Sequence, residues 1–135
     1  MKFLTEEWCE EFFALAKDTF SPEKTPSKAT LTLCECYSNV PQFGGDLVWM
    51  LYTFKNGVLT DTKRGTGRSS VPKADYITDA DYDFCVQSLT GPVNLLKALT
   101  GGKVKLKGNL LRATKLIDTH SYLDKCKLLN GKTEW

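Results

Sequence analysis

Hydrophobic and polar residues alternate along several stretches of the chain, and each change of period marks an expected element. In residues 103–107, lysines alternate with Val104 and Leu106. A strand with this pattern places the ammonium groups on one face and the apolar side chains on the other, so a half-buried strand is predicted. After Gly108, Asn109 is a suitable helix N-cap, and apolar residues then recur at helical spacing. We therefore expect a strand that turns sharply into a helix.

The N-terminal segment has the pattern of an amphipathic helix docked on a core. Thr5 can cap a helix whose first turn holds Glu6 and Glu7, where carboxylates suit the positive end of the helix dipole. Apolar side chains then recur at helical spacing: Trp8, Phe12, Leu15 and Ala16, with Phe20 beyond. Because residues 20–28 contain prolines and turn-forming residues, we expect a loop there.

Three strands are expected next. In residues 29–38, threonines and cysteines alternate with larger side chains, and the β-branched threonines suit a strand, although the pattern leaves open which face is buried. Residues 47–54 are apolar on both faces, which is typical of a central strand. Asn56-Gly57 is a strong hairpin signal before residues 58–63, so these two strands should be antiparallel neighbours.

The middle of the chain mixes a basic loop with short elements. Residues 64–73 are polar, basic and glycine-bearing, and we expect a mobile loop at the sheet edge. A short fourth strand is expected at residues 74–77. A helix capped by Thr78 or Asp79 should then run to about Leu89.

A second short helix is expected after it, with Pro92 in the first turn and Gly101-Gly102 at the end. The order is then helix, three strands, a loop and a fourth strand, two helices, a fifth strand and a final helix. This segregation of elements indicates an α+β fold. A chain of 135 residues has the size of one domain, so a single domain over residues 1–135 is predicted.

A string of residues in the C-terminal half carries a family resemblance: Thr90, Gly91, Lys97, Ala98, Gly101, Lys103, Lys105, Lys107, Gly108 and Asn109. This string resembles the sterol carrier protein 2-like family of lipid-binding domains, and a weaker likeness extends over residues 46–116. The resemblance implies a five-stranded, mostly antiparallel sheet covered on one face by helices. It also implies an apolar tunnel between sheet and helices.

In that family the tunnel holds a fatty acid, acyl-CoA, sterol or similar lipid, so the resemblance implies an inward-facing apolar lining here. The expected strand residues are Met50, Tyr52, Phe54, Val104 and Leu106. The expected helix residues are Val86, Leu89, Leu95, Leu96, Leu99, Leu110, Leu111 and Ile117. Each of these side chains suits a close-packed core equally well, and the sequence leaves both readings open.

The segment from about residue 118 onward is longer than the family's closing helix. Apolar residues at helical spacing continue through it: Tyr122, Leu123, Cys126 and Leu129. We expect a helix that ends near Gly131. It either forms a lid over the tunnel mouth or continues the preceding helix across the sheet.

Residues that carry chemistry are few and scattered. The five cysteines are an odd number, which fits reduced thiols, and Cys34-x-Cys36 is interpreted as small buried residues rather than a metal or redox pair. The single histidine, His120, is expected to be exposed on a helix. Three acids are expected at a helix start, where they would stabilise the dipole: Asp79, Asp81 and Asp83. No catalytic set, metal site or cofactor is predicted.

Two basic stretches each have two interpretations. Lys103, Lys105 and Lys107 either attract an anionic head group or membrane surface or form a solvated strand face. Arg64 and Arg68 flank a Gly-x-Gly segment that either aims backbone N–H groups at a phosphate or is a solvated loop.

Composition narrows the functional classes. With 41% hydrophobic residues, 25% charged residues and a net charge of +2, the chain has no signature of a nucleic-acid binder. The N-terminus carries acids where a signal peptide has its apolar core, so a cytoplasmic location is expected. The first hypothesis is non-catalytic binding and transfer of a lipid or acyl-CoA, with transient membrane contact. The alternative is an accessory or protein-interaction module with the same fold and a filled core, acting with a partner enzyme. A homodimer is left open under either hypothesis.

Overall fold

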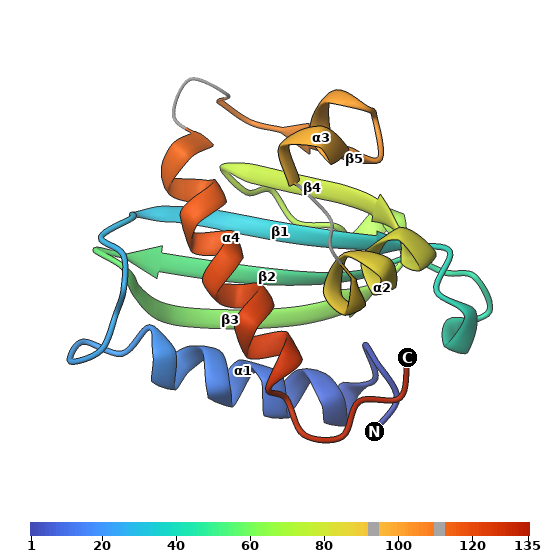
Figure 1. Cartoon of the computed structure of the whole chain (residues 1–135), viewed down its shortest axis with the longest axis horizontal. Helices are drawn as coiled ribbons and strands as arrows, with labels where there is room; N and C mark the ends of the chain where they lie inside the picture. Colours follow the sequence, from blue (N-terminus) through green and yellow to red (C-terminus); the bar gives the residue numbers. More distant parts are fainter. Residues whose placement is uncertain (92–94, 110–112) are drawn as a thin grey trace. The chain divides into compact units, whose positions relative to one another are not determined.

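The computed structural model of the chain describes residues 1–91, 95–109 and 113–135. Its helices are α1 (Glu6–Thr19), α2 (Tyr82–Thr90), α3 (Leu95–Thr100) and α4 (Ala113–Leu128), with short 3₁₀ segments η1 (Pro41–Phe43) and η2 (Arg68–Ser70). Its strands are β1 (Leu31–Ser38), β2 (Val48–Lys55), β3 (Val58–Thr66), β4 (Tyr76–Asp81) and β5 (Val104–Lys107). Figure 1 shows these elements along the chain.

The five strands form one mixed sheet in the order β3-β2-β1-β4-β5. Strand β1 pairs with β4 in parallel, and β4 pairs with β5 antiparallel. Helices and strands are segregated along the chain, so the predicted α+β class is confirmed.

The chain forms two compact units. The first unit contains Met1–Leu31, Tyr52–Thr62 and Asn109–Trp135, and the second contains Thr32–Leu51 and Lys63–Gly108. Strand β2 therefore begins in the second unit and ends in the first, and β3 runs the opposite way. The predicted helical cover over one sheet face and the predicted tunnel would involve both units, so they stay predictions.

The first unit is built around aromatic side chains of α1. As predicted, Thr5 is the N-cap, and its hydroxyl accepts a hydrogen bond from the Trp8 amide at 3.4 Å. The rings of Trp8 and Phe12 are stacked with centroids 5.3 Å apart. Phe20 completes the row and meets the Phe54 ring edge to face at 5.0 Å. Such pairs stabilise the packing by about 0.5–1.5 kcal/mol beyond the burial of their area.

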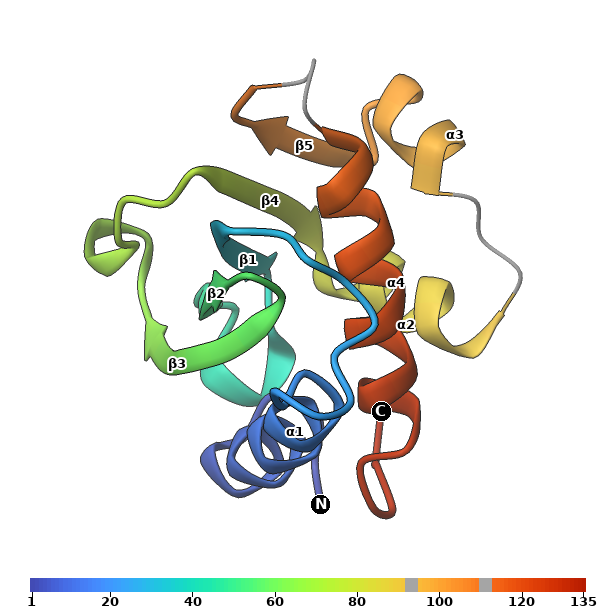
Figure 2. The same cartoon turned by 90° about the vertical axis from the view of Figure 1, so that its left-hand side faces the viewer.

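The two ends of the chain meet within the same unit. The N-terminal ammonium donates to the Lys132 carbonyl at 2.8 Å, and the Trp8 indole N–H donates to the Thr133 hydroxyl at 3.0 Å. Helix α4 packs against α1, and Figure 2 shows the two helices side by side. Helix α4 runs unbroken from Ala113 to Leu128. The segment from residue 118 onward therefore continues the preceding helix, which is one of the two arrangements expected for it.

The predicted hairpin turn is confirmed. Asn56 and Gly57 have φ angles of 50° and 82°, the left-handed pair that a two-residue hairpin requires. Gly57 also lies against the backbone of Ser27, where a Cβ atom would overlap the Ser27 carbonyl. The turn therefore requires glycine for two reasons.

The second unit packs its apolar side chains on one face of β1 and β2. Cys34, Cys36, Leu47 and Trp49 form a buried cluster there. The Trp49 indole N–H donates to the Ser70 hydroxyl at 2.9 Å, and that hydroxyl donates to the Thr66 carbonyl at 2.7 Å. The first bond attaches the end of η2 to β2, and the second attaches it to the end of β3.

Three local predictions for this unit were wrong. Residues 64–73 are not a free loop, because β3 continues to Thr66 and η2 follows, held by the Trp49–Ser70 bond. The fourth strand lies at Tyr76–Asp81 rather than 74–77, since it gains a register with β1. Consequently Asp81, not Thr78 or Asp79, caps α2. The expectation for Pro92 lies outside the described residues.

The corner after β5 depends on Gly108. Its φ is 143°, and a Cβ atom there would lie 2.6 Å from the Asp75 carbonyl oxygen and 2.6 Å from Cδ1 of Tyr76. Both neighbours precede or begin β4, so the close approach fixes the end of β5 against β4.

We predict that Gly108→Ala lowers the free energy of unfolding by about 2–4 kcal/mol, because the added methyl group meets backbone and the φ angle is strained. Chemical denaturation followed by circular dichroism measures the change. Gly44→Ala is the matched control, since Gly44 has a φ of 64° with nothing within 4 Å of an added Cβ. It should cost about 1 kcal/mol. Equal costs for both variants would show that the close approach is not a constraint.

Candidate functional site

The predicted apolar lining is divided between the two units. In the first unit, Tyr52 and Phe54 are buried and Ile117 is half-buried. The Tyr52 ring lies 6.0 Å from Phe12 and 5.9 Å from Phe13, so it packs against α1. Leu110 and Leu111 lie outside the described residues.

The other members lie in the second unit. Met50, Leu89 and Val104 are buried there. Val86, Leu99 and Leu106 are half-buried. Leu95 and Leu96 begin α3, but their side chains lie outside the described residues. The lining as a whole stays a prediction, because its members are divided between the two units.

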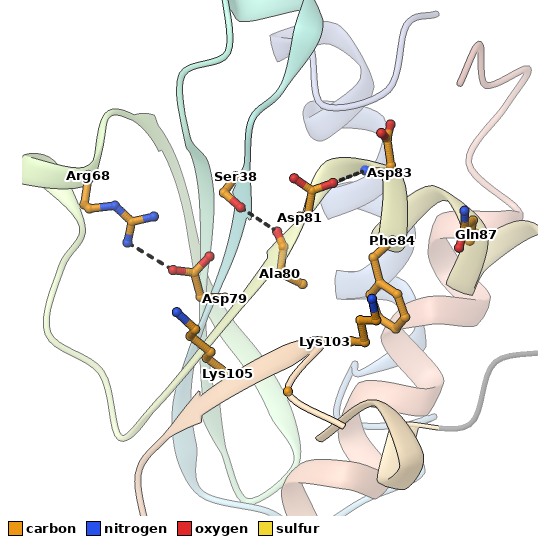
Figure 3. Close-up of a pocket in the computed structure, with 11 residues that line it drawn as sticks. Ser38, Arg68, Asp79, Ala80, Asp81, Asp83, Phe84, Gln87, Lys103 and Lys105 are labelled. Carbon is orange, nitrogen blue, oxygen red and sulfur yellow. Dashed lines mark hydrogen bonds and ion pairs between the residues drawn. The ribbon is translucent and has the colours of Figure 1, made fainter. Parts of the chain in front are cut away.

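A polar pocket of about 620 Å³ lies entirely within the second unit (Figure 3). Strands β4 and β5, the start of α2 and the η2 segment supply its walls: Ser38, Arg68, Asp79, Ala80, Asp81, Asp83, Phe84, Gln87, Gly102, Lys103 and Lys105. Figure 3 shows Arg68 and Asp79 on one side of the pocket and Phe84 and Gln87 on the other. The pocket therefore combines charged groups with one aromatic ring.

An ion pair forms one wall of this pocket. Arg68 Nη1 lies 3.0 Å from Asp79 Oδ2, and the Asp79 side chain is 23% exposed. Asp79 is also the cross-strand partner of Lys105 in the β4–β5 register. A carboxylate is thus placed beside two cations. The prediction that Asp79 belongs to a helix start was wrong, because β4 extends through it.

The other two carboxylates belong to the start of α2. Asp81 accepts a hydrogen bond from Asn39 Nδ2 at 2.8 Å and one from the Asp83 amide at 3.0 Å, which makes it the N-cap. Asp83 lies in the first turn, where the helix dipole stabilises a negative charge. For these two residues the predicted role at a helix start is confirmed.

The predicted alternation of β5 is confirmed, and it supplies the pocket's remaining cations. Lys103, Lys105 and Lys107 are exposed, whereas Val104 is buried. Of the three lysines, Lys103 and Lys105 line the pocket. Sequence reasoning named these lysines and Arg68 in separate stretches, but it did not predict that they face one pocket.

All five cysteines are free and buried, as predicted. Cys34 and Cys36 share one face of β1 and are joined by a thiol hydrogen bond, which raises the pKa of Cys34 together with burial. The same bond lowers the pKa of Cys36, with a smaller contribution from Arg68. In the first unit, burial raises the pKa of Cys126, whose sulfur lies 3.3 Å from the Thr19 hydroxyl.

The expectation that His120 is exposed was wrong. Its side chain is 18% exposed, and Nδ1 lies 3.3 Å from Asp124 Oδ2 one turn further along α4. Asp124 also binds Lys127 at 3.2 Å, and the Lys127 ammonium lies over the Phe12 ring at 5.9 Å. Because Lys127 is 2% exposed, this contact with α1 removes a charged side chain from water. The sequence pattern contains no signal for the burial of Lys127, since this lysine lies in the last turn of a helix.

The comparisons with known proteins concern the fold. No protein-family model and no curated protein sequence matches the chain. Among solved structures, small α+β domains are similar to this chain over nearly its whole length. The chain has the fold of sterol carrier protein 2, whose crystal structure matches with a TM-score of 0.75 and 21% identity over 93% of this chain and 97% of that one.

Two further structures support this assignment of fold. A conserved hypothetical protein from Thermus thermophilus, whose description suggests a sterol carrier protein, matches with a TM-score of 0.74 and 21% identity over 96% of this chain and 90% of that chain. Sterol carrier protein 2 from Yarrowia lipolytica, in its apo form, has a TM-score of 0.53 and 23% identity over 77% and 88% of the two chains. The resemblance inferred from the C-terminal string is confirmed at the level of fold.

The fold also matches part of a larger protein. A sec-alkyl sulfatase structure has a TM-score of 0.51 and 24% identity over 82% of this chain but 15% of the sulfatase chain. In the described part of this chain, no helix has the length and apolar character needed to cross a membrane.

We predict that the five native thiols do not react with Ellman's reagent within minutes, because burial keeps reagent away from all of them. Leu128→Cys, at a side chain that is 53% exposed, is the positive control. Its added thiol should react at least about a hundredfold faster than the buried thiols, which require local opening. All six thiols should react in guanidinium chloride. Rapid reaction of a native thiol in the folded protein would contradict the prediction.

Proposed function

We propose that the protein binds and carries a lipid with a long apolar chain, such as a fatty acid, acyl-CoA or sterol, without catalysing a reaction. The observation that carries this proposal is the fold match to sterol carrier protein 2 over 93% of this chain and 97% of that one. The apolar residues expected to line a tunnel lie on the elements predicted for them wherever they are described.

The proposed chemistry needs an apolar cavity and no reactive group. Removing a hydrocarbon chain from water is favourable by about 0.8 kcal/mol per buried methylene. A lining of buried and half-buried aliphatic side chains, such as Leu89, Val104 and Leu106, supplies a surface of the required kind. The carrier would act in the cytoplasm and exchange its ligand with membranes by transient contact.

A second candidate function is an accessory module that acts with a partner enzyme. One observation favours it: a similar fold forms 15% of the sec-alkyl sulfatase chain, so the fold also occurs inside a larger enzyme. The dense ring packing of Phe12, Phe20, Tyr52 and Phe54 is what a filled core would have. The two functions differ in whether the isolated protein holds a ligand.

We predict that the delipidated protein binds a fluorescent fatty acid, cis-parinaric acid, in a saturable way, and that native mass spectrometry detects one bound acyl chain. The test variant is Leu106→Trp. Leu106 is a half-buried residue of the predicted lining, and the larger tryptophan side chain should fill space that the acyl chain would occupy. Affinity should fall at least about tenfold, which corresponds to about 1.4 kcal/mol.

Leu128→Trp is the matched control, since it introduces the same ring at an exposed leucine. It should bind as tightly as the unchanged protein. Circular dichroism of both variants must match that of the original chain. No saturable binding by the folded, delipidated protein would contradict the carrier function and favour the accessory module.

A further inference from the structure

The polar pocket of the second unit is not explained by a carrier of apolar chains. Its volume of about 620 Å³ is within the range of ligand pockets. Its walls carry guanidinium, ammonium and carboxylate groups together with apolar surface. The kind of ligand that such a pocket binds depends on which of these charges the protein already compensates.

Each carboxylate is stabilised within the fold. Asp79 is paired with Arg68 at 3.0 Å. Asp81 accepts two hydrogen bonds as the N-cap of α2. Asp83 lies in the first turn of the same helix, where the dipole offsets its charge.

Two of the cations make no direct ion pair, although Asp79 faces Lys105 across the β4–β5 pairing. Lys103 and Lys105 are two residues apart around β5, so their side chains leave the same face of the strand. Within residues 1–91, 95–109 and 113–135, neither ammonium has an ion pair or hydrogen bond. Across the pocket from Phe84, Arg68 is held in place by Asp79 and keeps further N–H donors (Figure 3).

We propose that this pocket binds a phosphate monoester through Lys103, Lys105 and Arg68. Three cationic groups match the three terminal oxygens of a monoester, and an arginine fork with two lysines is a common way of binding phosphate. Phe84 and Gln87 also line the pocket, with Lys103 beside Phe84 (Figure 3), and they are available to contact the group that carries the phosphate. Gly102 contributes open space, since nothing lies within 4 Å of an added Cβ.

This site lies within one unit and does not depend on the proposed lipid tunnel. The phosphate monoester is either the head group of phosphatidic acid in a membrane or part of a soluble molecule. The chemistry of recognition is the same in both cases, so the source is decided by the test.

The test is a titration of the isotopically labelled protein with glycerol 3-phosphate, followed by backbone amide chemical shifts. The amides of Gly102, Lys103 and Lys105 should shift in a saturable way. In the double variant Lys103→Ala/Lys105→Ala the affinity should fall at least about tenfold, because charge-assisted hydrogen bonds are lost. Lys107→Ala is the matched control, as it removes a lysine from the same strand face outside the pocket and should change affinity less than about twofold.

A second arm measures sedimentation with vesicles of phosphatidylcholine that contain or lack phosphatidic acid. Binding of glycerol 3-phosphate alone assigns a soluble ligand, and binding of vesicles only when phosphatidic acid is present assigns the lipid head group. Either result supports the site if the double variant loses it. No binding in either arm, or binding that the double variant retains, overturns the proposal.

Asp83→Asn checks whether the pocket prefers a negatively charged ligand. Removing a negative charge from the pocket wall should strengthen binding of the phosphate. Weaker binding would show that the carboxylate attracts a cationic part of the ligand, and it would overturn the proposal of an anion site. A test with cis-parinaric acid on the same variants separates this result from the lipid-carrier function, which the lysine substitutions should leave unchanged.

Discussion

The second unit depends on the parallel pairing of β1 with β4. The register places Cys36 beside Asp79, and the antiparallel pairing of β4 with β5 then places Asp79 beside Lys105. A parallel pair requires a long connection between its strands, and here the connection contains the β2–β3 hairpin and η2. Arg68 in η2 is thereby brought to Asp79. The polar pocket is a consequence of this connection rather than of any local motif.

The elements that sequence reasoning predicted correctly are those that local chemistry determines. A Thr cap before acidic residues starts α1, and Asn56-Gly57 adopts the left-handed turn that the hairpin requires. The alternating lysines of β5 follow from the period of a strand. The errors lie where long-range contacts decide the outcome. Residues 64–73 have the composition of a loop, but the Trp49 indole holds them from another strand.

The candidate sites show the same division between local and long-range information. Lys103, Lys105 and Arg68 are each recognisable as candidate anion ligands, but their convergence depends on strand order, which no single stretch encodes. The apolar lining poses a different difficulty. Leu89 and Val104 would be equally apolar against a ligand or against other side chains, so residue type does not distinguish a tunnel from a core. The buried Lys127 could not be anticipated because its burial depends on the packing of α4 against α1.

The two proposed binding modes depend on different physical forces, and this difference makes them separable in one protein. Binding of a phosphate by exposed lysines weakens as salt is added, since the Debye length falls from about 30 Å at 0.01 M to about 10 Å at 0.1 M. Burial of a hydrocarbon chain depends on the area removed from water and is not screened in this way. A ligand that carries both groups would show the sum of the two dependences. The Arg68–Asp79 pair leaves Lys103 and Lys105 without a direct ion pair, so the salt-sensitive part of such binding should be assigned to the cations of the pocket and not to the apolar residues of either unit.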